Sequence, residues 1–274
     1  MTMKTIVPVL TIAGSDSSGG AGIQADLKTM VGHGVYGMSV ITAITAQNTT
    51  GVRSFDAVSP TMVTDQLEMV WADIPPLALK TGMLANACII SAVSKALRRF
   101  EAKNIVVDPV MVATSGDQLI TDDAIDTMVS ELFPLATLIT PNVNEAKRLT
   151  GTDDIAAQLT TLHAMGVTNV LLKGGDRTDN NHKKDVLSLD NGAKCIVLDT
   201  PAVDTPNTHG TGCTLSSAIA SRLALCDNVE EAVRNAKDYI YNAIERGSHF
   251  KVGHGHGPVN HYIAIHDENN HLFL

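Results

Sequence analysis

The sequence predicts an open α/β sandwich of three layers, with a largely parallel central sheet between two layers of helices. Compact apolar runs alternate with amphipathic helical stretches along nearly all of the 274 residues, which is the pattern of successive βαβ units. The apolar runs are continuous, as in strands that are covered on both faces. Asn191-Gly192 between two further apolar runs predicts a hairpin, which breaks the strict alternation that a closed eight-fold barrel needs.

Buried strands are expected wherever apolar and β-branched residues form a compact run. They are, in chain order, Ile6–Ala13, Ser39–Thr45, Leu77–Thr81, Ile105–Asp108, Thr137–Thr140 and Asn169–Lys173. The predicted hairpin adds Val186–Leu189 and Cys195–Leu198. In an open parallel sheet ligands bind at the carboxyl ends of the strands, so the loops that follow these strands are where a site is expected.

Helices are expected between the strands, and three of them carry clear start or stop signals. Residues 60–72 begin with Ser59 as N-cap and Pro60 at the first helical position. Residues 121–133 and 229–246 repeat apolar residues at helical spacing, and proline and glycine respectively end them. These stripes predict helices that pack one face against the sheet.

Composition limits the class of protein. The chain has 29 Asp and Glu against 20 Lys and Arg, a formal charge of −9, which argues against nucleic acid as the principal partner because backbone phosphates require a basic face. With 44% hydrophobic and 18% charged residues it can bury a core. Its length and the absence of a linker or repeat favour one domain over residues 1–274.

The expected location is the cytoplasm, without a membrane partner. The first apolar run is too short to span a bilayer, and no cleavage site follows a long apolar stretch.

The four cysteines are expected to be free thiols. They are far apart in the sequence and form no C-x-x-C pair: Cys88, Cys195, Cys213 and Cys226. Of these, Cys88, Cys195 and Cys226 are expected to be small buried packing residues.

A first glycine cluster, residues 14–22, follows the first strand and opens a helix. Its glycines allow close backbone approach to a ligand, and the free N–H groups at the helix start suit a polar group. Residues 20–25 formally match a dinucleotide fingerprint, but no acidic residue lies between Asp26 and Asp56 to bind a ribose. The Walker-A spacing is absent. A glycine-rich turn without a ligand remains the alternative.

A second glycine cluster, residues 207–214, runs directly into the apolar helix Leu215–Leu225. Successive N–H groups at a helix start form an anion cradle that suits a phosphoryl group gaining charge during transfer. Cys213 lies on this terminus, where a positive potential lowers the pKa of a thiol. We therefore expect Cys213 to form a thiolate that accepts a proton from a substrate hydroxyl.

Three further strand ends carry charged residues. Glu145 lies in the loop-to-helix segment 140–145, where it could hold Mg²⁺ beside Asn142 or simply be a helix-dipole partner. Lys173 follows an apolar strand, where a nucleotide phosphate could lie, and Asp108 ends another strand as a candidate to organise the metal. Six of the ten histidines fall between residues 249 and 271 with no metal-site spacing, which favours a mobile or packed tail.

In combination these motifs resemble the ribokinase-like superfamily of ATP-dependent kinases and, within it, the hydroxymethylpyrimidine (phosphate) kinases of thiamine biosynthesis. The resemblance covers about residues 8–262. It is carried by residues 13–29, 41–52, 80–84, 108–117, 140–146, 173–175, 207–214 and 253–258. It implies a Rossmann-like αβα sandwich, an active site at the strand ends, Mg-ATP as donor and a homodimer. A monovalent cation is a further candidate cofactor.

The same resemblance implies roles for individual residues. The aminopyrimidine would be hydrogen-bonded by Asp26 and Gln47 and lined by Gly14, Met83 and Val110. The matched residues for catalysis and the nucleotide are Gly210, Gly212 and Cys213 for the anion hole and base, and Lys173, Thr208 and Thr211 near the ATP phosphates. The implied reaction is phosphorylation of a substrate CH₂OH, and of the resulting monophosphate as well.

Three alternatives remain. Pyridoxal or pyridoxine kinase is the nearest, alone or as a second activity, since one subgroup of that activity shares the scaffold. Gln47 and the presence of Ala113 in place of a second cysteine favour the pyrimidine, whereas Thr114 stands where those kinases usually carry Lys. A nucleotide-binding regulatory protein would have no use for a thiol in the cradle. A cysteine hydrolase needs an oriented histidine base, and His209 is not expected to reach back.

Overall fold

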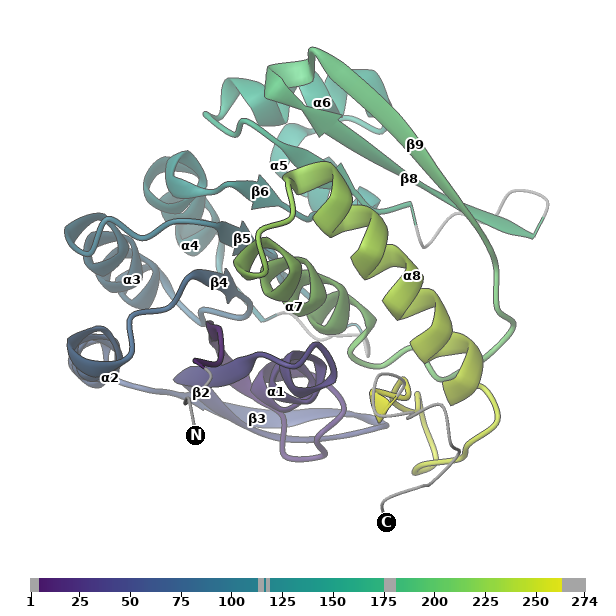
Figure 1. Ribbon diagram of the computed structural model, residues 1–274, viewed down its shortest axis with the longest axis horizontal. Coiled ribbons are helices and arrows are strands. Elements are labelled where there is room, and N and C mark those ends of the chain that lie inside the picture. The colour runs from purple at the N-terminus through teal and green to yellow at the C-terminus, as the bar shows by residue number, and fades with distance from the viewer. Residues whose placement is uncertain (1–4, 113–115, 117–118, 175–180, 263–274) are drawn as a thin grey trace.

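The computed structural model describes residues 5–112, 116, 119–174 and 181–262. Its strands form one nine-stranded sheet in the order β3-β2-β1-β4-β5-β6-β7-β8-β9. Helices cover both faces of this sheet (Figure 1). The predicted open three-layer sandwich is therefore confirmed.

Strands β2, β1, β4, β5, β6 and β7 are neighbours in this order and run parallel to one another. At the two edges, β3 runs antiparallel to β2, β8 runs antiparallel to β7, and β9 runs antiparallel to β8. The bounds are β1 Pro8–Ser15, β2 Tyr36–Asn48, β3 Gly51–Ala57, β4 Ala78–Thr81, β5 Ile105–Val107, β6 Leu138–Ile139, β7 Val170–Leu172, β8 His182–Leu189 and β9 Lys194–Pro201. Each predicted strand overlaps one of these, because a run buried on both faces leaves a continuous apolar signal.

One helical layer consists of α1 (Gly22–Gly32), α7 (Thr211–Ala224) and α8 (Val229–Gly247). The other consists of α2 (Pro60–Asp73), α3 (Ala87–Arg99), α4 (Asp122–Thr127), α5 (Val143–Thr150) and α6 (Ile155–Ala164). A separate apolar core lies between the sheet and each layer. Figure 1 shows α7 between α1 and α8, and three buried serines of α7, Ser216, Ser217 and Ser221, give it a narrow profile there.

The predicted helix boundaries are largely observed. Ser59 caps α2, since its side chain accepts a hydrogen bond from the Met62 N–H at 3.2 Å, and Pro60 is the first helical residue. The predicted helix over residues 121–133 is not one regular helix in the structure. After α4 it widens into a π-helical turn, Met128–Leu132, and then narrows into a short turn that contains Pro134, which has no N–H to continue the helix.

Two hairpins flank the parallel strands. The predicted one joins β8 to β9, and its turn residues Asp190, Asn191 and Gly192 all have positive φ, at 52°, 56° and 88°. The other joins β2 to β3 and was not predicted. Most of the β3 side chains are exposed, so the strand has no apolar run for sequence reasoning to find.

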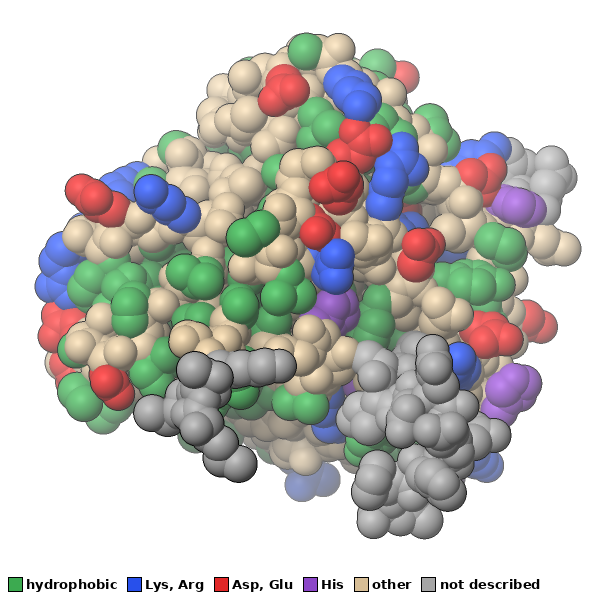
Figure 2. All heavy atoms as spheres, viewed as in Figure 1, with side chains coloured by type: hydrophobic (Ala, Val, Ile, Leu, Met, Phe, Trp, Pro, Cys, Tyr) green, Lys and Arg blue, Asp and Glu red, His purple; other side chains and the backbone are tan. Residues whose placement is uncertain are grey.

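The face of the molecule in Figure 2 carries charged side chains of both signs. On the face in Figure 2, acidic and basic side chains of the described residues are interspersed over α8 and the neighbouring hairpin rather than gathered by sign. No helix in the described part of the chain is long and apolar enough to cross a membrane.

Candidate active site

A cavity of about 700 Å³ lies at the carboxyl ends of the parallel strands. This is within the usual size of small-molecule sites. All but one of the residues predicted for the site line it: Gly14, Gln47, Met83, Asp108, Val110, Asn142, Glu145, Lys173, Thr208, Gly210, Thr211, Gly212 and Cys213. The structure therefore brings together residues from seven segments that are distant in the sequence.

The first glycine-rich loop forms one wall and is organised by Asp16. This buried carboxylate accepts hydrogen bonds from the N–H groups of Ser18, Gly20 and Ala21 at 2.8, 3.0 and 2.8 Å. The same loop is joined to β2, because the Ser17 hydroxyl donates to the Gln47 carbonyl oxygen at 2.7 Å. Gln47 lies at a register shift between β2 and β3. The loop thus fixes the position of Gln47 at the cavity.

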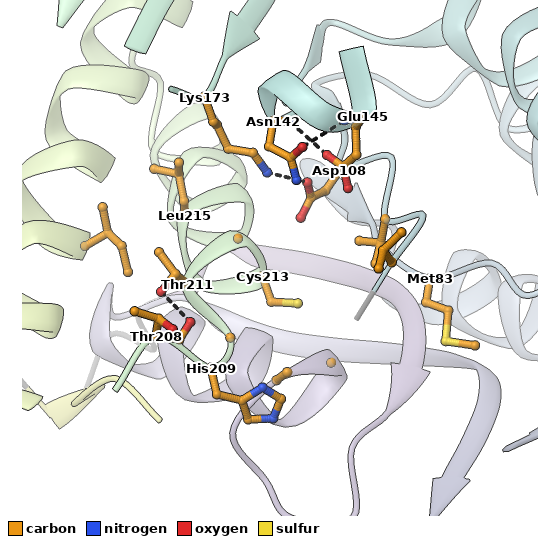
Figure 3. Close-up of a pocket in the computed structure, with 18 of the residues that line it drawn as sticks. Met83, Asp108, Asn142, Glu145, Lys173, Thr208, His209, Thr211, Cys213 and Leu215 are labelled. Atoms are coloured by element: carbon orange, nitrogen blue, oxygen red, sulfur yellow. Dashed lines mark hydrogen bonds and ion pairs between the residues drawn. The ribbon is translucent and has the colours of Figure 1, made fainter. Parts of the chain in front are cut away.

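The second glycine-rich loop forms an adjoining wall and ends at the start of α7. Gly210 has φ of 80°, and a Cβ there would lie 1.9 Å from the Gly20 carbonyl oxygen. A Cβ on Gly212 would lie 3.5 Å from both Asp108 Oδ2 and Lys173 Nζ. The loop therefore packs backbone to backbone against the first loop, and its helix start faces the charged residues across the cavity (Figure 3).

His209 connects the two loops. Its Nε2 lies 2.8 Å from Asp16 Oδ2, and both side chains are almost fully buried. Hydrogen bonds from His209 and the loop amides hold the pKa of Asp16 well below its ordinary value of 3.8, against the opposing effect of burial. Neither residue was predicted to have this role. Sequence reasoning considered His209 only as a base for Cys213, whereas the structure turns it toward Asp16.

Cys213 lies half-buried at the centre of the cavity wall (Figure 3). Two expectations about cysteines are wrong. Burial raises the pKa of the Cys213 thiol to about 11, although the Lys80 ammonium and the Gly22 N–H act to lower it. The helix start alone does not make a resting thiolate, because the thiol is also desolvated. In addition, Cys88, Cys195 and Cys226 are exposed rather than packed in the core, and all four cysteines are free thiols as expected.

A cluster of three charged side chains lies opposite the cradle. Lys173 Nζ lies 3.0 Å from Asp108 Oδ1, and Asp108 also accepts a hydrogen bond from the Thr140 hydroxyl at 3.1 Å. These partners keep the pKa of Asp108 low despite burial, whereas burial raises the pKa of Glu145 to about 7. Charge from Asp108 and Glu145 raises the pKa of Lys173 against the effect of burial. The lysine is therefore a fixed cation at the strand ends.

The side chains beside Lys173 could supply some, but not all, of the ligands that Mg²⁺ needs. In the described part of the chain, no group of three or more His, Cys, Asp or Glu could hold a metal by itself. Mg²⁺ at phosphoryl-transfer sites usually takes one or two carboxylates, with phosphate oxygens and waters completing the shell, and Asp108 with Glu145 offers those carboxylates. Asn142 differs from expectation, because its side-chain oxygen caps α5 by accepting from the N–H groups of Asn144 and Glu145.

Asp26 is the exception among the predicted site residues. It is fully buried behind the cavity wall, and the wall does not include it. Its carboxylate accepts hydrogen bonds from the hydroxyls of Thr11 and Ser217 at 2.6 and 2.7 Å, and both of its oxygens lie 3.0 Å from Lys80 Nζ. With its oxygens so occupied, Asp26 has no access to a substrate in this structure. The structure thus places Asp26 outside the cavity, whereas the resemblance implies a contact with the aminopyrimidine.

The segment from Gly253 to His261 packs behind the second loop. The Gly257 carbonyl oxygen accepts a hydrogen bond from the His209 N–H at 3.0 Å, and the His256 N–H donates to the Thr49 carbonyl oxygen at 2.9 Å. His261 is buried with its Nε2 3.0 Å from the Thr214 hydroxyl, next to Cys213 in the chain. In the described part of the predicted histidine-rich tail, His261 is therefore packed, whereas His249, His254 and His256 are exposed. Ala113 and Thr114 lie outside the described residues.

The outer end of the cavity was not predicted as part of the site. It is lined by Lys237, Ile240, Tyr241 and Ile244 of α8 together with Pro201 and Val203 after β9. Ile240 and Ile244 belong to the apolar stripe of the last helix, which suggested only core packing. Apolar and aromatic side chains beside a few polar groups are typical of sites that bind small molecules.

Comparison with known proteins agrees with this fold. A family model described as phosphomethylpyrimidine kinase matches residues 16–260. The chain is 46% identical over 262 residues to a hydroxymethylpyrimidine/phosphomethylpyrimidine kinase of Rhizobium meliloti (strain 1021), covering 92% of this chain and 96% of the relative. It is 43% identical over 264 residues to the protein of the same description from Escherichia coli (strain K12), covering 94% and 98%.

Another relative is longer than this chain. The thiamine biosynthesis bifunctional protein ThiED of Geobacter sulfurreducens (strain ATCC 51573 / DSM 12127 / PCA) is 48% identical over 264 residues, which are 94% of this chain and 53% of that protein. The chain therefore spans about half the length of such bifunctional relatives.

Solved structures resemble the chain over most of its length. A pyridoxal kinase of Bacillus subtilis in complex with ADP superposes with a TM-score of 0.86 at 37% identity and covers 94% of this chain and 98% of its own. A phosphomethylpyrimidine kinase of Clostridium difficile 630 has a TM-score of 0.75 at 43% identity and covers 87% and 99%. The fold and the site define a ribokinase-like α/β protein. Within that class, the chain belongs to the phosphomethylpyrimidine kinase family.

Proposed function

We propose that the protein is an ATP-dependent kinase that phosphorylates the CH₂OH group of 4-amino-5-hydroxymethyl-2-methylpyrimidine and then the resulting monophosphate, in thiamine biosynthesis. One observation carries the proposal: a single cavity holds an anion cradle, a thiol at its edge and a fixed lysine with two carboxylates opposite. The names of the family and of the curated relatives support the same activity.

In the proposed reaction the substrate hydroxyl attacks the γ-phosphorus of ATP in line with the bond to ADP. The hydroxyl proton moves to Cys213 Sγ, the new O–P bond forms, and the bond to the ADP oxygen breaks. The N–H groups at residues 210–213 stabilise the transferring group, for which one donor of an anion hole is worth roughly 3–4 kcal/mol. Lys173 offsets charge on the phosphates.

Mg²⁺ would supply further charge neutralisation to the donor phosphates. Asp108 and Glu145 are the residues that would hold it, because both carboxylates lie beside Lys173 at the cradle. Asn142 would contribute by fixing the helix start on which Glu145 lies, since the Asn142 N–H donates to Glu145 Oε2 at 2.8 Å. A monovalent cation remains an expectation.

The two ends of the cavity would bind the two substrates. The pyrimidine would lie between Gly14, Met83 and Val110, with Gln47 available to its amino edge. The adenine ring would lie at the outer end, against Tyr241 and the apolar residues of α8. Thr208 and Thr211 would then flank the phosphates at the cradle, where the Thr211 hydroxyl already donates to the Thr208 carbonyl oxygen at 2.7 Å.

A second candidate function is pyridoxal kinase, in place of the pyrimidine activity or beside it. It is favoured by the TM-score of 0.84 with a Staphylococcus aureus pyridoxal kinase in complex with AMP-PCP and pyridoxal, at 35% identity. Pyridoxal is also a flat heteroaromatic ring with a CH₂OH group, so the same base and cradle would serve it.

The deciding experiment compares kcat/KM for hydroxymethylpyrimidine, its monophosphate, pyridoxine and pyridoxal with purified protein and Mg-ATP. We expect the pyrimidines to be preferred, and a clear preference for pyridoxal would overturn the primary proposal.

Two variants test individual residues. Gln47→Met should lower kcat/KM selectively for the pyrimidines. Cys213→Ala should retain substrate binding while losing about 10²–10⁴-fold in turnover, and near-normal kcat in that variant would exclude Cys213 as the base.

We also propose a cytoplasmic homodimer without a nucleic-acid partner. The exposed edge strand β3 and the exposed side chains of Ile44 and Phe55 on its hairpin offer a surface for self-association. Light scattering after size-exclusion chromatography would give the mass in solution. A monomer at micromolar concentration would contradict the dimer.

A further inference from the structure

Lys80 places a positive charge in the interior of the protein. Its side chain is 0% exposed, and Asp26, also 0% exposed, is its ion-pair partner. Taking two such charges out of water is costly, and replacing a buried pair by apolar residues is often neutral or stabilising. The pair therefore calls for an explanation other than stability. The predicted substrate contact of Asp26 does not provide one, because Asp26 is outside the cavity.

The pair lies directly behind the cavity wall that contains the thiol. A Cβ on Gly82, which lines the cavity, would lie 3.0 Å from Lys80 Nζ. On the other side, Asp26 Oδ1 accepts a hydrogen bond from the Ser217 hydroxyl at 2.7 Å. Ser217 is one helical turn after Cys213, so both side chains are on the same face of α7. The ammonium is thus held between the cavity floor and the helix face that carries Cys213.

We infer that Lys80 is a positioning residue for the reaction: its buried ammonium, held in place by Asp26, stabilises the thiolate form of Cys213 from behind the cavity wall. The inference rests on the proposed function, in which Cys213 accepts the proton of the substrate hydroxyl. The resting thiol first loses its proton to solvent, and the thiolate then takes the hydroxyl proton as the O–P bond forms. Lys80 touches neither substrate and transfers no proton.

The groups that act on the thiol come from several elements. Lys80 of β4 favours the thiolate, as does the N–H of Gly22 at the start of α1, whereas Asp26 of α1 and Asp108 after β5 oppose it. The charge on Lys173 after β7 is also coupled to Cys213. Because Lys80 and Asp26 act in opposite directions, removing each should move the reactivity of Cys213 in opposite directions. A pair that only supports the fold would not do so.

The test measures alkylation of each cysteine by iodoacetamide as a function of pH, with mass spectrometry to separate the sites. In Lys80→Met, we expect Cys213 to be alkylated about tenfold more slowly at pH 8, the equivalent of one pKa unit. In Asp26→Asn, which leaves the ammonium without its carboxylate, Cys213 should be alkylated faster than in the unmodified protein. Cys88, Cys195 and Cys226 are exposed internal controls whose rates should not change.

Turnover gives a second readout. In Lys80→Met the kcat for the hydroxymethyl substrate should fall by about tenfold or more while the KM for that substrate changes less than about threefold. If Lys80→Met does not fold, Asp26→Asn tests the inference by itself. Ser217→Ala, which keeps both charges and removes one hydrogen bond from the carboxylate, is a third variant and should slow alkylation of Cys213.

Three outcomes would overturn the inference: unchanged alkylation of Cys213 in a folded Lys80→Met protein, a shift in the same direction in Lys80→Met and Asp26→Asn, or faster alkylation in Ser217→Ala. Failure of the proposed function is distinguishable, because it would appear as no phosphorylation of any hydroxymethyl heterocycle by the unmodified protein. The alkylation profile does not depend on turnover.

Discussion

Asp16 and His209 are separated by 193 positions in the sequence, yet His209 Nε2 lies 2.8 Å from Asp16 Oδ2 in the interior. Each belongs to a different glycine-rich loop, and the two loops form adjoining walls of the cavity. The contact holds the first loop against the loop at the start of α7. The relative position of the two loops is therefore set by a buried side-chain contact as well as by their close backbone packing.

Removing His209 should loosen both loops. We expect His209→Ala to lower the free energy of unfolding by about 2–4 kcal/mol, since one partner of a buried pair is lost while backbone N–H groups still bind Asp16. Urea unfolding would measure this, and kcat should fall as well. His182→Ala is the matched control, because His182 pairs with Asp199 on the surface, with both side chains about half exposed, and should cost less than about 1 kcal/mol. Equal losses would contradict the role of the Asp16–His209 contact.

Phosphorylation of the hydroxymethyl substrate should become faster with rising pH. With a thiol pKa of about 11, the thiolate fraction of Cys213 increases about tenfold per pH unit below that value. We expect kcat/KM to rise steadily between about pH 6.5 and 9. The monophosphate substrate is a control, because its acceptor oxygen is already ionised above about pH 6 and needs no base. A flat profile for the hydroxymethyl substrate would argue against Cys213 as the base.

Stability should fall in mild acid because of His261. Burial lowers the pKa of His261 from 6.5 to about 4, so the unfolded chain binds a proton that the folded protein does not. The contribution of His261 is complete above pH 6.5 and is lost as the pH falls toward 4, by up to about 3 kcal/mol at 1.36 kcal/mol per pKa unit. Urea unfolding at several pH values would show this slope, and His261→Gln should reduce it. An unchanged slope in that variant would assign the proton uptake elsewhere.

Gly210 should tolerate no side chain. A Cβ would lie 1.9 Å from the Gly20 carbonyl oxygen, so Gly210→Ala must separate the two loops and should abolish most activity. Gly151→Ala is the matched control. Gly151 also has positive φ, at 75°, but nothing lies within 4 Å of its added Cβ. It should cost about 1–2 kcal/mol of stability from backbone strain alone and leave kcat unchanged. Similar kinetics for the two variants would show that close packing of the loops is not required.

The fold was largely predictable because its strands are buried on both faces. Such strands leave continuous apolar runs in the sequence. The β8–β9 turn was predictable because its positive φ angles favour Asn and Gly, which stand at residues 191 and 192. β3 was missed because an exposed edge strand needs no apolar residues. The π-helical turn after α4 was missed because its apolar spacing is close to that of a regular helix.

Most of the predicted site residues lie at the cavity, and their roles stay predictions. Glycines before a helix and charged residues at strand ends have local signals, so the positions of the glycine cradle, Lys173 and Asp108 could be predicted. Asp26 was misplaced because its motif matches a substrate-binding pattern, whereas its burial depends on Lys80 and Ser217 from distant elements. The direction of the Cys213 pKa was wrong for a related reason. The effect of a helix start is local, but desolvation depends on the whole surrounding fold.

The packing of residues 253–261 behind the cradle also affects the order in which the site can form during synthesis. The cradle at residues 207–213 leaves the ribosome before the segment that braces it, including Gly257 and His261. A nascent chain that has emerged only to the end of α8 contains the strands of the sheet and the helices of both layers, but its cradle still lacks those contacts. The contacts that brace the cradle are therefore expected to form only after residues 253–261 have emerged.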